Sequence, residues 1–209
     1  SGIGSHIVDI IITPPDNPQP NTETPTNNNV PTWTWSSVLD AVEYEVTLNG
    51  LVIGNQTKTS FVVNEELNTG NHEIKVRAKD AVGNYSNYGT HIVEIDTSAP
   101  DIPRPNTNTP TNNNTPTWTW NKIQDAVEYE IIIDNEFKQT INSESYTSSS
   151  FQDGEHEIKV RSVDSVGNYS AYGSHIVIID TLAPDVPQPN SNTPTKNTSI
   201  KWTWLLVQR

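Results

Sequence analysis

The 209-residue chain contains no cysteine and no methionine, and its 12 basic side chains face 25 acidic ones. Without cysteine there is no disulfide framework, no thiolate metal site and no cysteine nucleophile. The net charge of −13 repels nucleic-acid phosphates and anionic membrane surfaces, so we expect no nucleic-acid partner. Because an initiator methionine is also missing, we expect a fragment or a processed chain.

Long apolar runs are scarce as well. The longest one near the N-terminus, residues 7–12, is interrupted by Asp9, whereas a membrane-spanning helix needs about 20 apolar residues. We therefore expect no membrane insertion. Hydrophobic residues make up 33% of the chain, yet it has 6 tryptophans and 7 tyrosines, so a few large aromatic side chains must supply most of the core.

The sequence also lacks the common catalytic motifs. The sequence has no G-x-S-x-G elbow, phosphate-binding loop, H-E-x-x-H pair or nucleotide fingerprint. The abundant carboxylates, such as Glu43, Glu45 and Glu65-Glu66, fall on expected strand faces and loops rather than in a cleft. We therefore expect a protein that is not an enzyme.

What the sequence does contain is an internal repeat. The segment HEIKVRAKDAVGNYS at 72–86 returns as HEIKVRSVDSVGNYS at 156–170, with twelve of fifteen positions identical. A Trp-Thr-Trp triplet starts at Trp33, Trp118 and Trp202. The period of about 84 residues is too long for a solenoid unit of roughly 20–50 residues and suits a small independent domain.

The repeat divides the chain into four parts. Residues 1–13 match the last strand of a preceding repeat, 18–97 and 103–181 are whole repeats, and 187–209 match the beginning of a truncated third one. We therefore expect a slice from a longer array, in which adjacent repeats of the same chain are partners. Both incomplete ends carry an apolar strand, which predicts end-to-end association through the truncated repeats.

Within each repeat, apolar and polar residues alternate with the period of a β-strand. The alternation is clear at 44–48 and 72–76, and it recurs at 129–133 and 156–160. Turn signals such as Asn49-Gly50 separate these segments. The pattern predicts an all-β fold of tandem antiparallel β-sandwiches of about 84 residues each.

The order of segments resembles fibronectin type III and bacterial Ig-like modules. It runs from a Trp-bearing strand through an Ala-x-x-Tyr-Glu-Val/Ile strand to an Ile-x-Val-Arg strand and a Gly-Asn hairpin. The resemblance implies that Trp35 and Trp120 are the core tryptophans of the second strand. It also implies that His72 and His156 stand where the family often has a buried corner tyrosine. These sandwiches host many unrelated roles, so the resemblance specifies fold better than function.

Two sets of residues are candidate sites. Ca²⁺ prefers several carboxylate and carbonyl oxygens, and it is the single cofactor we consider. Aspartates recur at equivalent repeat positions and are candidate ligands, with turn capping as the alternative: Asp80, Asp96, Asp101, Asp164, Asp180 and Asp185. Trp33 and Trp118 are candidates for stacking on a glycan, with core packing as the alternative.

The linkers at 96–105 and 180–189 are rich in proline, which restricts φ and makes semi-rigid spacers. The sequence favours a non-catalytic structural or adhesive spacer that projects a distal domain from a bacterial cell surface or a secreted protein. This places the chain outside the cell or on its surface, with another surface protein as a candidate partner. The alternative is an accessory carbohydrate-binding module of a secreted polysaccharide-active enzyme.

Overall fold

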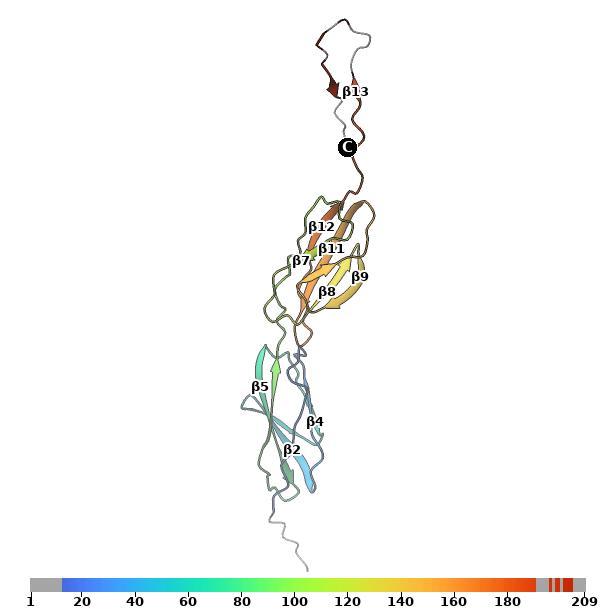
Figure 1. Ribbon diagram of the computed structural model, residues 1–209. Helices are drawn as coiled ribbons and strands as arrows, with labels where there is room; N and C mark the ends of the chain where they lie inside the picture. Colours follow the sequence, from blue (N-terminus) through green and yellow to red (C-terminus); the bar gives the residue numbers. More distant parts are fainter. Residues whose placement is uncertain (1–12, 191–195, 197, 200, 205–209) are drawn as a thin grey trace, which may run out of the picture. The chain divides into compact units, whose positions relative to one another are not determined.

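The computed structural model describes residues 13–190, 196, 198–199 and 201–204 (Figure 1). Every regular element in these ranges is a β-strand. No helix in the described part of the chain is long and apolar enough to cross a membrane. The terminal strand expected within residues 1–13 lies outside the described residues apart from Thr13.

The chain divides into two compact units. The first contains Ser1–Asp101 together with two loop segments of the second repeat, Gln124–Val127 and Val163–Ser170. The second contains Ile102–Ile123, Glu128–Ser162 and Ala171–Arg209.

A four-stranded antiparallel sheet forms the larger layer of the first unit. Its strand order is β3-β2-β5-β6, and β2 and β5 lie side by side in Figure 1. The bounds are β2 (Ala41–Leu48), β3 (Leu51–Gln56), β5 (Gly70–Asp80) and β6 (Gly89–Ile95). Asn49 and Gly50 join β2 to β3 with φ values of 49° and 80°. Positive φ at both residues is what a two-residue type I′ hairpin turn requires.

The smaller layer pairs β1 (Thr32–Thr34) with β4 (Ser60–Val62), and Trp33 lies opposite Phe61. The segment before β1 contributes to both layers. The N–H of Asn21 donates to the carbonyl of Thr34 (2.9 Å), and the N–H of Thr26 donates to the carbonyl of Glu94 (3.0 Å). This segment therefore covers the free edge of β6, which would otherwise expose unpaired backbone groups.

The second unit repeats this plan. Its sheet order is β12-β11-β8-β9, with a two-stranded β7–β10 layer. The bounds are β7 (Thr117–Thr119), β8 (Glu128–Ile133), β9 (Glu136–Ile141), β10 (Ser145–Thr147), β11 (Gly154–Val163) and β12 (Gly173–Ile179). Thr111 bridges β12 in parallel at Ile179, just as Thr26 bridges β6 at Ile95.

The core of each sandwich is built on its tryptophans. Trp33 has no exposed surface and Trp35 has 6%, and the values at Trp118 and Trp120 are the same. Trp35 meets Tyr44 edge to face at 5.7 Å between ring centroids. Isoleucines and valines of the larger sheet complete the first core: Val46, Ile74, Val76, Val93 and Ile95.

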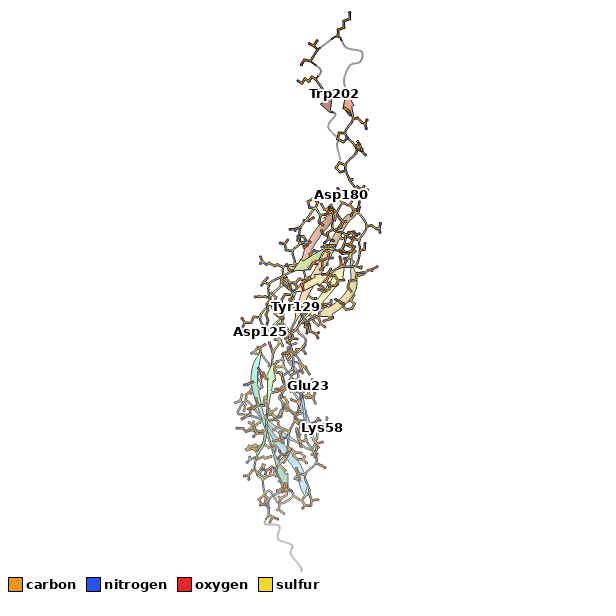
Figure 2. All side chains as sticks on the ribbon, in the orientation of Figure 1. Glu23, Lys58, Asp125, Tyr129, Asp180 and Trp202 are labelled. Atoms are coloured by element: carbon orange, nitrogen blue, oxygen red, sulfur yellow. The ribbon has the colours of Figure 1, made fainter. Side chains whose placement is uncertain are left out.

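The start of the third repeat forms a short hairpin of β13 (Pro189–Asn190) and β14 (Thr203–Trp204). Trp202, labelled in Figure 2, is 54% exposed, whereas its counterparts Trp33 and Trp118 are fully buried. The described residues of the third repeat include no four-stranded sheet that could pack over this indole, whereas such a sheet covers Trp33 and Trp118.

The observed topology confirms the all-β prediction. Two sandwiches, each with a four-stranded sheet and a smaller layer, have the strand order of fibronectin type III-like repeats. Trp35 and Trp120, which directly follow β1 and β7, lie in the cores as the resemblance implied.

Gly89 and Gly173 begin the last strand of each sandwich, where another backbone approaches closely. A Cβ on Gly89 would lie 1.6 Å from the carbonyl oxygen of Pro18, and one on Gly173 would lie 1.7 Å from that of Pro103. Any side chain at these positions would push the proline segment off the sheet.

We predict that Gly173→Ala destabilises the second sandwich by about 3 kcal/mol, since overpacking against a fixed backbone commonly has this effect. Urea denaturation followed by tryptophan fluorescence measures it. The matched control is Ser174→Ala, one residue later and exposed, which should change the unfolding free energy by less than about 0.5 kcal/mol. Equal stabilities of the two variants would contradict the prediction.

Candidate functional site

The turn between the last two strands of each sandwich is built around a buried aspartate. Asp80 is 2% exposed, and its Oδ1 accepts the N–H groups of Val82 (3.0 Å) and Asn84 (2.8 Å). Its Oδ2 accepts the Nδ2 group of Asn84 (2.8 Å). Burial by itself raises the pKa of Asp80, but these N–H donors and that of Gly83 lower it by more. The carboxylate is therefore ionised and holds the turn closed.

Asp164 and Asn168 repeat this arrangement, and Asn168 contacts the linker backbone as well. Besides Asp164, Nδ2 of Asn168 lies within hydrogen-bonding distance of the carbonyl oxygens of Asp96 (2.8 Å) and Ser98 (3.3 Å). These residues follow β6, and all of them belong to the first compact unit. The asparagine thus holds the turn and fastens the linker backbone with the same amide group.

Burial at the turn agrees with this contact. Val82 is 61% exposed in the first turn, and Gly83 is exposed beside it. Their counterparts Val166 and Gly167 are half-buried. A Cβ on Gly167 would lie 3.7 Å from Nδ2 of Asn27, so the 163–170 turn also meets the loop that contains Asn27.

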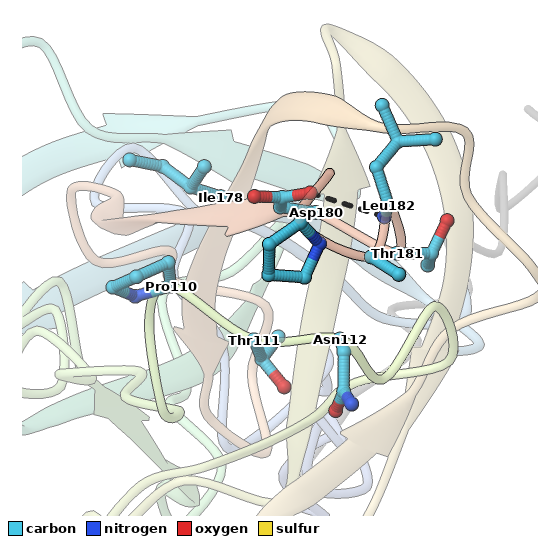
Figure 3. A pocket seen from close by; sticks show the side chains of 9 residues that line it. Pro110, Thr111, Asn112, Ile178, Asp180, Thr181 and Leu182 are labelled. Atoms are coloured by element: carbon cyan, nitrogen blue, oxygen red, sulfur yellow. Dashed lines mark hydrogen bonds between the residues drawn. The ribbon is translucent and has the colours of Figure 1, made fainter. Parts of the chain in front are cut away.

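A hollow of about 430 Å³ lies at the end of the second unit, where β12 runs into its linker (Figure 3). In its lining, the carboxylate of Asp180 accepts the N–H of Leu182 (3.1 Å). The lining combines the 110–112 loop with the residues after β12: Pro110, Thr111, Asn112, Ile178, Asp180, Thr181, Leu182, Ala183 and Pro184.

The structure does not gather the six calcium candidates at one place. Asp80 and Asp164 hold turns, and Asp96 and Asp180 cap the N–H groups two residues later, at 2.9 and 3.1 Å. Asp101 and Asp185 are exposed. These contacts match the capping alternative. Within the described ranges, no group of three or more histidine, aspartate or glutamate side chains is placed to hold a metal ion.

A second hollow places Asp80 near two aspartates that the sequence did not single out. Asp16, Asp40 and Asp80 line a hollow of about 170 Å³ in the first unit, together with Leu39 and the 13–15 segment. Asp40 lies in a turn and has a φ of 62°. Its spacing from the other two aspartates matches no metal-binding motif, so the sequence did not identify it as a candidate ligand.

The two glycan-stacking candidates are core residues. Trp33 and Trp118 are completely buried, so neither offers a ring face to a sugar. Their strand partners are Phe61 and Tyr146. The core-packing alternative describes both positions.

His72 and His156 stand where fibronectin type III-like modules often have a corner tyrosine, and they also make the hydrogen bond that this tyrosine makes. Nε2 of each ring lies against a carbonyl four residues upstream, that of Asn68 (2.7 Å) or Gln152 (3.0 Å). A corner tyrosine makes the same kind of bond with its hydroxyl. The corner hydrogen bond is therefore kept.

The two histidines differ in the partner of their second nitrogen. Nδ1 of His72 faces the amide of Asn49 at 2.9 Å, and Nδ1 of His156 faces the carboxylate of Asp134 at 2.7 Å. Burial by itself lowers the pKa of His156, but Asp134 and the carbonyl of Gln152 raise it by more. The second sandwich thus contains a histidine–aspartate pair where the first has a histidine–asparagine pair.

An ion-paired ladder covers the outer face of each larger sheet. Arg77 binds both carboxylate oxygens of Glu45 at 2.9 and 3.0 Å and lies 4.0 Å from the ring centroid of Tyr85. The Arg77 guanidinium holds the pKa of Glu45 below its ordinary value. Glu130 and Arg161 form the corresponding pair at 2.8 Å. From the sequence we expected only solvated acidic strand faces here. The ion pairs were not predicted, because the partners are brought together by the register of neighbouring strands.

No family model matches the chain, and no curated protein does. Among solved structures, the fibronectin(III)-like modules of CbhA from Clostridium thermocellum are similar, with 14% identity and a TM-score of 0.48 over 77% of this chain and 94% of that one. The central fibronectin-III array of RIM-binding protein is similar at 18% identity and a TM-score of 0.33, over 91% of this chain and 79% of that one. These values carry no argument about function, and the fold assignment rests on the strand topology.

We predict that the second sandwich loses stability as the pH rises from about 5.5 to about 8, since the ordinary histidine pKa is about 6.5. The pKa of His156 is raised in the folded state. Protonation therefore stabilises the fold below the unfolded pKa, and this stabilisation is lost as the pH rises through the folded pKa. Because Asp134 is 45% exposed, the change should be about 1 kcal/mol or less.

Urea denaturation at several pH values, followed by NMR signals of each sandwich, measures this effect. Asp134→Asn should flatten the pH profile of the second sandwich by giving it the partner that the first one has. Asn49→Asp is the converse variant and should introduce a pH dependence in the first sandwich. An unchanged profile in Asp134→Asn would sink the explanation.

The calcium hypothesis stays a prediction, and it has a direct measurement. It expects CaCl₂ to raise the melting temperature of the chain more than NaCl does at equal ionic strength, because a ligand bound only by the folded state stabilises it. Melting curves that superimpose in the two salts would contradict it.

Proposed function

We propose that this chain is a non-catalytic spacer, in which tandem sandwiches hold a distal domain away from a bacterial cell surface or from the body of a secreted protein. The observation that carries the proposal is the contact of Asn168 with the linker carbonyls of Asp96 and Ser98. A linker fixed by a turn of the following repeat transmits orientation, which a free tether does not.

Other features of the described residues support a mechanical role. Each sandwich has its own tryptophan core, so it needs no neighbour to bury its apolar face. Pro103 and Pro105 are buried where the linker enters the second sandwich. Their fixed φ values reduce the freedom that the linker would otherwise have.

The charge of the chain suits an extracellular array. A net charge of −13 favours solubility and makes neighbouring copies repel one another. The ladders on the outer sheet faces pair Glu43 with Lys79 and Glu45 with Arg77, so they do not leave a cationic surface for nucleic acids. An adhesive role, a surface location and contact with another surface protein remain parts of this proposal.

The carbohydrate-binding alternative has lost the two residues on which it was based. It depended on Trp33 and Trp118, and both are enclosed by their cores. No contact among the described residues favours it over the spacer.

The spacer proposal predicts a narrow distribution of distances between dyes placed on the two sandwiches. The absence of cysteine allows clean labelling of a Lys58→Cys, Glu136→Cys variant, because both positions are exposed. Single-molecule energy transfer should show one narrow population. Asn168→Ala should broaden it, since the linker carbonyls then lose their donor.

The matched control is Asn84→Ala, which removes the corresponding bond to Asp80 within the first turn and should leave the distribution narrow. A broad distribution in the parent chain, or equal widths in Asn168→Ala and the parent, would refute the stiff spacer.

A further inference from the structure

The hollow at the end of the second unit corresponds, residue by residue, to a place in the first unit that is filled. Asp180 and Leu182 are the counterparts of Asp96 and Ser98, one repeat of 84 residues earlier. Asn112 is the counterpart of Asn27. In the first unit these positions contact the 163–170 turn through Asn168 and Gly167.

From this equivalence we infer that the hollow is a docking site for an Asp-x-x-Gly-Asn turn, of the kind found at Asp80–Asn84 and Asp164–Asn168, presented by a following repeat. The inference rests on the proposed spacer function and names the partner of its linker. The turn's asparagine would donate to the carbonyl oxygens of residues 180 and 182, and its glycine would lie against Asn112.

Backbone geometry supports the same occupant. Thr111 accepts the N–H of Asp180 (3.0 Å), just as Thr26 accepts that of Asp96 (2.9 Å). The carboxylates of Asp96 and Asp180 both cap the N–H two residues later. The linker therefore leaves both sandwiches with these two hydrogen bonds in common, and they help to set the direction of the carbonyls that the first unit uses.

Side-chain differences favour an apolar addition to this contact. Glu94 and Ser98 in the first repeat are replaced by Ile178 and Leu182 in the second, which are 40% and 73% exposed. The docked turn of the first unit carries Val166, which is half-buried there. A valine at the same position would cover Leu182 and bury apolar surface that the second unit now exposes.

The test completes the third repeat. Residues 187–209 are replaced by a copy of residues 103–190, which keeps the period of 84 because Pro187 corresponds to Pro103. We expect the amide NMR signals of Thr111, Asn112 and Thr181 to shift relative to the 209-residue chain. Cleavage at Asp185 by an aspartate-specific endoprotease should slow about tenfold, because cleavage follows the population of the opened linker.

Replacing the asparagine of the added turn by alanine should reverse both effects, and replacing its exposed serine, the counterpart of Ser165, should not. If the added repeat folds, as shown by blue-shifted tryptophan emission, and the amides and the cleavage rate stay unchanged, docking is refuted. Should that repeat not fold, a cyclic peptide of residues 164–169 titrated into the parent chain provides the test. Saturable shifts of the same three amides support docking. If these amides do not shift up to the highest peptide concentration in the titration, docking is refuted.

These outcomes are separate from those of the spacer proposal. Docking is measured at the end of the second unit, whereas stiffness is measured by the dye distances in the 209-residue chain. A narrow dye distribution without docking would leave the spacer intact and remove only the partner of this hollow.

Discussion

Burial of the Trp-Thr-Trp strand is the constraint on which each sandwich depends. With 33% hydrophobic residues, a repeat of this size has few side chains large enough to fill the space between two sheets. Trp33 and Trp35 fill it only if the four-stranded sheet closes over them. The half-exposed Trp202 illustrates the point, because its hairpin forms in the described residues without that sheet. Close approaches such as that of Pro18 to Gly89 serve the same closure.

Outside the core, the repeats use side chains of equivalent position for different purposes. Asn84 and Asn168 both hold a turn through a buried aspartate, and Asn168 reaches the linker backbone that follows β6. Asn49 and Asp134 both occupy the first position of a hairpin turn and bond a corner histidine. The exchange of an amide for a carboxylate places an anion beside the histidine of the second repeat, and this carboxylate raises the pKa of His156. The duplicated sequence therefore provides its own matched comparison for each interaction.

The fold could be predicted almost entirely from the sequence, and the contacts at the candidate sites only in part. Alternation at 44–48 and 72–76 located strands because side chains on a strand point alternately to its two faces. The Asn49-Gly50 turn was visible because few residues accept positive φ. The aspartates were visible as a recurring type, yet their role as turn caps depends on which N–H groups face them. The ion pair of Glu45 with Arg77 depends on cross-strand register, and composition does not contain it.

By itself, the sequence determined the repeat, its period, the strands, the turns and the absence of cysteine chemistry, since all of these follow from the identity and spacing of neighbouring residues. Tertiary structure decided that both tryptophans are buried in each of the two whole repeats, that His156 meets Asp134, and that Asn168 binds carbonyls 70 and 72 residues away. The physical reason is one of range. Local periodicity shows which face of a strand is apolar, but a polar side chain takes its partner from whatever backbone the packed sheets bring within about 3 Å of it.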